Sequence, residues 1–177
     1  MGAGLVGLAA WCPVRPGIVL GASMEPTLHP GQPFLYARDA ASRHAVGRGD
    51  VVVLHVHGET LIKRIYALGG DVVWTAALRA DPDTRFPLSL GAPIDQCRRR
   101  YPGMIFERVI VPRDCLYVVG ENNGSVDSRD FGPVPASGVR GRVITVAADP
   151  GVPAVGFRVP PAPKRHASAT TPAAAPA

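Results

Sequence analysis

Two residues of this 177-residue chain stand in settings that suit a nucleophile and its base. Ser23 follows Gly21 and Ala22, small residues that let another backbone approach closely. Lys63 lies in an apolar, strand-like run, and only two of the 19 basic residues are lysines. Burial can lower the pKa of a lysine enough to leave a neutral amine near pH 7, whereas arginine stays charged. Such an amine can accept the proton of a serine hydroxyl, which is nucleophilic catalysis with a general base.

Other signatures of a serine nucleophile do not fit the surroundings of Ser23. A nucleophile elbow requires glycine two residues after the serine, where this chain has Glu25, and a Ser-x-x-Lys motif requires lysine where it has Pro26. A Ser-His-Asp triad would recruit a histidine. His55 and His57 alternate on a predicted strand and would share a face, but we expect structural or solvated roles for both. A metal site on this pair would need further ligands, for which the sequence offers no candidate.

The isolated residues also admit a structural interpretation. In it, Lys63 is an edge-strand lysine whose amine reaches solvent, and Ser23 is a turn residue before Pro26. The catalytic and the structural interpretation are equally supported by these residues alone.

Charge and cysteine content predict neither a nucleic-acid-binding protein nor a metalloprotein. The net charge is +5 and the isoelectric point about 9.6, but the basic residues are scattered, which indicates a solvated surface. Cys12, Cys97 and Cys115 have no Cys-x-x-Cys spacing, so we expect no metal site and no cofactor. Cys97 and Cys115 could close a loop in an oxidising compartment, a pairing that the sequence leaves open.

Short apolar runs separated by Gly, Pro, Asn and Asp predict a mostly β, antiparallel domain over residues 20–158. The predicted strands are 34–36, 51–57, 60–67, 72–74, 104–111, 116–119 and 139–146. Gly58 and Glu59 predict a hairpin that places Lys63 on its return strand. Residues 75–103 are expected to be an irregular insertion, and the Pro- and Ala-rich residues 159–177 a disordered tail.

Residues 1–19 form an apolar N-terminal segment with more than one interpretation. Its apolar stretch, residues 2–11, is shorter than the roughly 20 residues that span a bilayer and is followed by Pro13, Arg15 and Pro16. It also lacks the basic start of a signal peptide. A remnant of a membrane anchor, a membrane-dipping segment and a buried first strand all remain open.

Four short motifs follow one another between residues 20 and 146. They are Ser23-Met24-Glu25-Pro26-Thr27-Leu28, Gly49-Asp50-Val51-Val52, Lys63-Arg64 with Gly70-Asp71, and Gly120-Glu121-Asn122 with Ser125-Val126-Asp127-Ser128-Arg129. In this order they resemble the boxes of type I signal peptidases, membrane-bound Ser/Lys endopeptidases that include the mitochondrial inner-membrane peptidases. One such motif is a weak signal, whereas four in the right order are a specific one.

The resemblance implies a role for each matching residue. Ser23 would be the nucleophile and Lys63 the general base, with the Ser23 backbone N–H in the oxyanion hole. Ser125 would hydrogen-bond and orient the lysine. Asp127 and Arg129 would hold the surrounding loop together by an ion pair.

The resemblance also implies the substrate and its setting. The substrates would be precursor proteins bearing N-terminal signal peptides, bound as an added strand at the cell membrane, with the catalytic domain on the extracytoplasmic side and lipid nearby. Small residues at the −1 and −3 positions would enter shallow apolar pockets beside Met24, Leu61 and Ile62. No nucleic-acid partner is expected, and the oligomeric state is not predicted.

This chain departs from the family pattern at several positions. Gly21 occupies a position where some members carry a serine hydroxyl, although others also have glycine. Ala67 and Gly69 stand where glycine and proline are usual. Glu121 replaces the usual aspartate, and the loop from there to Ser125 is one residue shorter.

Two other functions remain open. A LexA-like self-cleaving protein shares the Ser/Lys chemistry and a related β fold, but it needs a DNA-binding domain for which the 22 residues before Ser23 are too few. A non-catalytic β module that binds extended peptides or a membrane surface would tolerate Ser23→Ala without loss of function. A peptidase would not.

Overall fold

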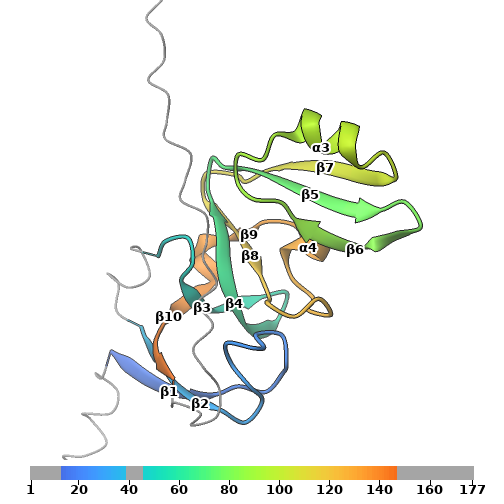
Figure 1. The fold of residues 1–177 in the computed structure, drawn as a ribbon. Coiled ribbons are helices and arrows are strands. Elements are labelled where there is room, and N and C mark those ends of the chain that lie inside the picture. The colour runs from blue at the N-terminus through green and yellow to red at the C-terminus, as the bar shows by residue number, and fades with distance from the viewer. Residues whose placement is uncertain (1–12, 39–45, 147–177) are drawn as a thin grey trace, which may run out of the picture.

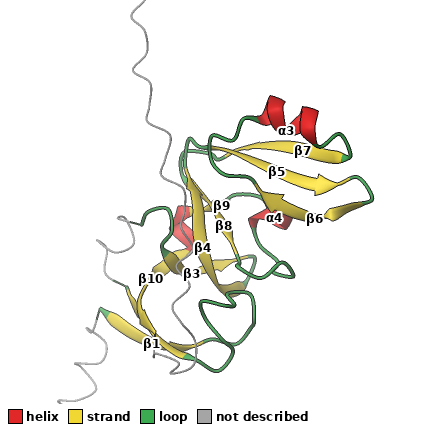
Figure 2. Cartoon of the chain, in the orientation of Figure 1, coloured by secondary structure: helices red, strands yellow, loops and turns green. Residues whose placement is uncertain are grey.

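The computed structural model describes residues 13–38 and 46–146, which form two antiparallel sheets with short helices (Figure 1). The first sheet has seven strands in the order β1-β2-β10-β3-β4-β8-β9, and the second has three in the order β6-β5-β7. Strands outnumber helices throughout the described chain (Figure 2), so the predicted mostly β fold class is confirmed. The elements are β1 (Val14–Ile18), β2 (Pro33–Ala37), β3 (Val51–Val56), β4 (Glu59–Leu68), β5 (Val72–Leu78), β6 (Asp81–Pro87), α3 (Ile94–Arg100), β7 (Met104–Ile110), β8 (Cys115–Val119), α4 (Ser128–Phe131), β9 (Val134–Pro135), the 3-10 turn η1 (Ala136–Gly138) and β10 (Val139–Val146).

The hairpin of β3 and β4 places Lys63 in the middle of the first sheet. The two strands form the predicted hairpin, and Val52 lies opposite Lys63 in its register. His57 and Gly58 form the turn with positive φ angles of 51° and 81°, the backbone that tight hairpin turns require. The strand prediction was wrong for His57, because the turn begins there; only His55 lies on β3. The two histidines therefore do not share a strand face, and the His57 ring instead contacts Phe131.

Two apolar clusters hold β4 and the Ser23 segment in place. Val52, Leu54, Ile65 and Val118 belong to a cluster between β3, β4 and β8. The turn after Ser23 is anchored by other side chains, Met24 and Leu28, which pack with Val19, Phe34 and Val53. Burial of a large apolar side chain contributes roughly 1.5–3 kcal/mol, so two such anchors on either side of a turn hold it firmly to the sheet.

The prediction of an irregular insertion at residues 75–103 was wrong. These residues extend β5, then form β6 and α3, and β7 follows directly, so that the second sheet and its helix stand beside the first sheet (Figure 1). The sequence hides β6 because it begins Asp-Pro-Asp and ends in Pro87. Proline cannot donate to a sheet ladder, but β6 is an edge strand and tolerates it.

The predictions for the two ends of the chain fall largely outside the described residues. These include the disordered tail at 159–177 and the apolar stretch at 2–11. Within the N-terminal segment, Val14–Ile18 forms β1, which pairs with β2 at the edge of the first sheet. In residues 13–38 and 46–146, no helix is long and apolar enough to cross a membrane.

Candidate active site

Lys63 is a buried lysine whose amine has one hydroxyl partner. Its side chain on β4 is only 3% exposed, and Nζ donates a hydrogen bond of 2.7 Å to Ser125 Oγ. Burial is the largest influence on the Lys63 pKa and lowers it from the ordinary value of 10.5. Asp127 and Asp130 oppose this effect by attraction, while Arg129 adds to it by repulsion. The site therefore favours a neutral amine at lower pH than a solvated lysine would.

Ser23 lies beside the same hydroxyl through its backbone. Its carbonyl oxygen accepts hydrogen bonds from the Glu121 N–H at 2.8 Å and the Asn122 N–H at 3.3 Å. Gly120 separates Ser23 from Ser125: a Cβ atom on this glycine would lie 2.6 Å from the Ser23 carbonyl oxygen and would overlap Ser125 Oγ. The structure thus brings Ser23, Ser125 and Lys63 to one place, with Ser125 in contact with the lysine.

Ser23 itself is half-buried, which leaves its side chain accessible. Within the described part of the chain, no hydrogen bond joins the Ser23 and Lys63 side chains, and no backbone hydrogen bond uses the Ser23 N–H as donor. Catalytic hydrogen bonds are often long before substrate binds and tighten in the complex. An oxyanion on a bound substrate would need a backbone donor of this kind.

The loop that carries Ser125 is held by a buried carboxylate. Asp127 is fully buried, and its Oδ2 accepts a 2.7 Å hydrogen bond from the Gly120 N–H. Arg129 donates to both carboxylate oxygens, from Nε at 2.9 Å and from Nη2 at 2.7 Å. The hydrogen bond to Asp127 is the main cause that raises the Arg129 pKa. Asp127 also caps α4 in a capping box with Asp130.

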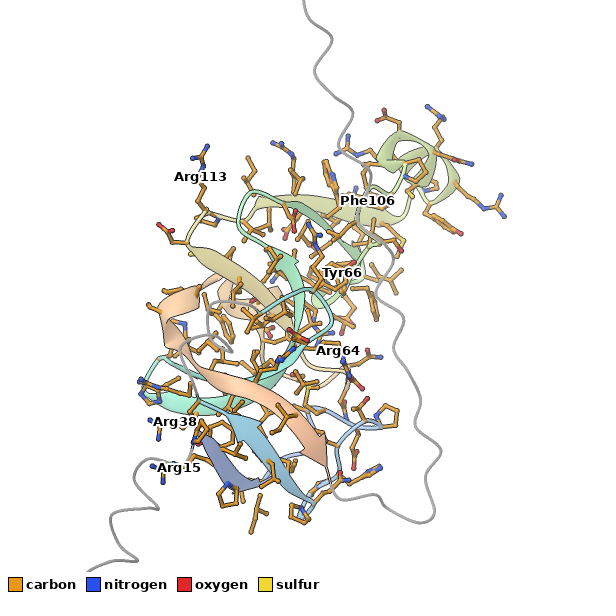
Figure 3. All side chains as sticks on the ribbon, turned by 90° about the vertical axis from the view of Figure 1, so that its left-hand side faces the viewer. Arg15, Arg38, Arg64, Tyr66, Phe106 and Arg113 are labelled. Carbon is orange, nitrogen blue, oxygen red and sulfur yellow. The ribbon has the colours of Figure 1, made fainter. Side chains whose placement is uncertain are left out.

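Sequence reasoning missed a second ion pair, between Arg64 and Glu121. Arg64, which Figure 3 labels, donates from Nε to Glu121 Oε1 at 2.7 Å and from Nη1 to the Gly49 carbonyl at 2.7 Å. Thr27 Oγ1 donates to the other carboxylate oxygen of Glu121. Because the backbone N–H of Glu121 binds the Ser23 carbonyl, this residue connects the Ser23 turn to β4. The one signal in the sequence that could have drawn attention to this residue is the departure from the family pattern at Glu121.

The motif aspartates away from Lys63 have structural roles. Asp71 accepts hydrogen bonds from Arg48, with Nε at 3.0 Å, and from the Leu68 N–H at 2.7 Å, which closes the turn after β4. Asp50 accepts from the Gly47 N–H at 2.8 Å. These contacts stabilise the end of β4 and the start of β3, and they do not involve Ser23 or Lys63.

The three residues expected to line substrate pockets do not form one surface. Met24 is 1% exposed and belongs to the core, packed on the same cluster as Ile62. Leu61 packs on the other cluster, that of Val52 and Leu54, because side chains alternate between the two faces of a strand. Leu61 is thus on the Lys63 face of β4, and Ile62 is on the other face.

Cys97 and Cys115, whose pairing the sequence left open, form no disulfide in the structure. Cys97 and Cys115 are both free thiols in the structure, and Cys12 lies outside the described residues. In the described ranges, no group of three or more His, Cys, Asp and Glu residues could hold a metal ion.

Comparison with known proteins places the chain among peptidases. Residues 1–148 match the family described as signal peptidase, peptidase S26. The chain is 32% identical over 129 residues to a mitochondrial ATP-independent inner membrane protease subunit 1b of Arabidopsis thaliana, covering 70% of this chain and 64% of that protein. It is 29% identical over 136 residues to a mitochondrial inner membrane protease subunit 1 of Mus musculus, covering 72% and 66%.

The matched region spans just under two thirds of the length of these relatives. A crystal structure of a signal peptidase I from Enterococcus faecalis is 25% identical, covers 56% of this chain and 97% of that one, and superposes with a TM-score of 0.37. The family match extends over every motif described above, from Ser23 to Arg129. The chain therefore belongs to the signal peptidase family, peptidase S26.

Proposed function

We propose that this protein is a serine endopeptidase that removes N-terminal signal peptides from exported precursor proteins, with Ser23 as nucleophile and Lys63 as general base. The observation that carries the proposal is the buried amine of Lys63, hydrogen-bonded to Ser125 next to the backbone of Ser23. Membership of the signal peptidase family supports the class of reaction. The dyad explains why a lysine, rather than an arginine, occupies the buried position 63.

In this mechanism, Lys63 carries protons through two steps. The neutral amine takes the proton of Ser23 as its hydroxyl oxygen attacks the scissile carbonyl carbon, and the oxyanion forms against the Ser23 N–H. Lys63 then gives the proton to the leaving amine, which leaves an ester on Ser23. A water molecule, deprotonated by Lys63, attacks this ester; the bond to the Ser23 oxygen breaks, the product leaves with a new carboxyl end, and Lys63 returns its proton to Ser23. Ser125 keeps the amine in place between these transfers.

We base the proposed substrate and location on the family and on the two relatives, which are mitochondrial by name. The two relatives are named inner membrane proteases, so we place the reaction at a membrane. We assign this chain to the cell membrane, with the catalytic domain on the extracytoplasmic side, where exported precursors emerge. The precursor binds extended, with small residues at −1 and −3, and lipid lies nearby.

A cleavage assay tests the proposal directly. The substrate is a precursor with alanine at −3 and −1, and the variants are Ser23→Ala and Lys63→Met. Ser137→Ala and Lys164→Met serve as matched controls for the loss of a hydroxyl and of an amine. We expect the parent and both controls to cut once after the −1 residue, and each dyad variant to lose at least about a thousandfold in kcat.

The result also separates this proposal from a peptide-binding module without catalysis. If circular dichroism shows that Ser23→Ala is folded and this variant still cuts, Ser23 is not the nucleophile. If the folded parent binds the precursor but does not cut it in detergent or lipid, the peptidase assignment fails.

A further inference from the structure

The second sheet makes direct contact with the loop that positions Lys63. On edge strand β6, Arg85 donates a hydrogen bond from Nη1 to the Arg129 carbonyl at 3.2 Å. Arg129 donates one in return, from its own Nη1 to the Arg85 carbonyl at 3.5 Å. Two arginines 44 residues apart thus exchange hydrogen bonds between β6 and α4.

Arg129 connects this contact to the site, because its guanidinium donates hydrogen bonds within the loop that carries Ser125. Besides the two bonds to Asp127, Nη2 donates to the carbonyls of Asn122 at 3.2 Å and Ser125 at 3.4 Å. Ser125 in turn accepts the hydrogen bond of Lys63. Hydrogen bonds therefore connect Arg85 to Arg129, Arg129 to the backbone of Ser125, and the side chain of Ser125 to the Lys63 amine.

Arg85 is itself held firmly by the second sheet. It pairs with Ala77 of β5 in the strand ladder, and its Nε lies 3.4 Å from Glu107 Oε2 on β7. The side chain is partly exposed, and the ion pair with Glu107 lies at the surface. Such a surface pair contributes little stability. The bond to the Arg129 carbonyl is the contact of the Arg85 side chain that reaches the site, while the Arg85 backbone carbonyl accepts the bond from Arg129.

We propose that Arg85 is a positioning residue, which uses the second sheet to hold the Ser125–Arg129 loop in the geometry that keeps Lys63 oriented. This inference rests on the proposed Ser/Lys function. If Arg85 positions this loop, the second sheet contributes to catalysis, and it does so through one side chain on β6. The competing interpretation is that β6 only adds stability to the fold.

The test compares Arg85→Met with Arg85→Lys and with Arg108→Met. Arg108→Met is the matched control, since it removes an exposed arginine from β7 of the same sheet. In the precursor assay, we expect Arg85→Met to lower kcat about tenfold, the worth of a hydrogen bond from a charged group, with KM within about twofold. Arg85→Lys keeps the positive charge and a hydrogen-bond donor group, so its kcat should lie between those of Arg85→Met and the parent. Arg108→Met should behave as the parent.

A second readout does not need activity. The chain has two lysines, so labelling with 13C-lysine yields two ε-CH2 signals, and Lys63→Met assigns one of them. We expect the Lys63 signal to titrate at higher pH in Arg85→Met than in the parent, because a looser loop admits water to the amine. Arg108→Met should titrate as the parent does.

Each outcome decides the proposal. It is supported if Arg85→Met loses kcat and shifts the Lys63 titration while Arg108→Met does neither. It is overturned if the Lys63 titration is unchanged in Arg85→Met, or if both methionine variants change alike, which is what a purely stabilising sheet predicts. If the parent cuts no precursor, the Ser/Lys peptidase proposal fails, and the titration alone still decides whether Arg85 positions Lys63.

Discussion

Lys63 Nζ and Ser125 Oγ lie 2.7 Å apart in the interior of the protein, although 62 residues separate them in sequence. The hydroxyl is the hydrogen-bond acceptor that the structure gives to this amine. In the proposed mechanism, this bond determines where the lone pair of a neutral Lys63 points when substrate arrives.

Removing the hydroxyl should slow the reaction without abolishing it. Ser125→Ala leaves Ser23 and Lys63 in place but lets the amine rotate, so we expect kcat to fall about tenfold to a hundredfold. Steady-state cleavage of the precursor with alanine at −3 and −1 measures this. The control is Ser137→Ala. Loss as complete as in Ser23→Ala would mean that Ser125 takes part in the bond-making step, and an unchanged kcat would mean that it does not orient the lysine.

Gly120 should tolerate no side chain, because its backbone separates the two serines. A Cβ atom there would lie 2.6 Å from the Ser23 carbonyl oxygen and overlap Ser125 Oγ, so Gly120→Ala must displace the nucleophile, the lysine partner or both. A displacement of about 1 Å can lower a rate about a hundredfold. We expect a loss of this size in kcat/KM.

Gly124→Ala is the matched control in the same loop. The nearest heavy atom to a Cβ there would be Asn122 Oδ1 at 3.6 Å, an ordinary contact. This variant should retain the activity of the parent. Equal losses in the two variants would show that the loop is sensitive to any added methyl group rather than to the Ser23–Ser125 spacing.

The pH dependence of the reaction should follow the Lys63 amine. Burial lowers its pKa below the ordinary 10.5, and the base is the neutral form, so kcat/KM should rise with pH through this lowered pKa. The midpoint of the rise and the 13C titration of the Lys63 ε-CH2 group should coincide. If the midpoint of the rise in kcat/KM differs from the midpoint of the 13C titration, the limiting proton transfer belongs to another group.

Lys63 should also reduce the stability of the fold at neutral and acidic pH. Because its folded pKa is lower than its unfolded pKa, the cost of burying the charge is fully present below the folded pKa. This cost shrinks as the pH rises, and it is gone above the unfolded pKa. We expect Lys63→Met to raise the free energy of unfolding by about 1 kcal/mol at pH 6, because it removes the cost of the buried charge; stabilising substitutions are commonly of this size.

Urea denaturation at several pH values measures this difference, with Lys164→Met as the control. The gain from Lys63→Met should decrease as the pH approaches 10. A variant that is less stable than the parent at pH 6 would show that the hydrogen bond to Ser125 outweighs the burial of the charge.

Local pattern was enough to predict the strands around the dyad. Alternating apolar residues indicated β3 and β4, and the turn signal at Gly58 placed Lys63 on the return strand of a hairpin. These features depend on neighbours within a few residues, where backbone preference and side-chain alternation dominate. The expectation that Ser23 and Lys63 are partners came instead from the resemblance of the four ordered motifs to a known family.

Only the tertiary structure decided the contacts between distant segments. β6 begins Asp-Pro-Asp, so no local preference reveals it; pairing with β5 makes it a strand. The ion pair of Arg64 with Glu121, and the exchange of hydrogen bonds between Arg85 and Arg129, join segments far apart in the chain. Such contacts form when packing brings the segments together, and burial rather than local sequence then selects which polar groups must pair.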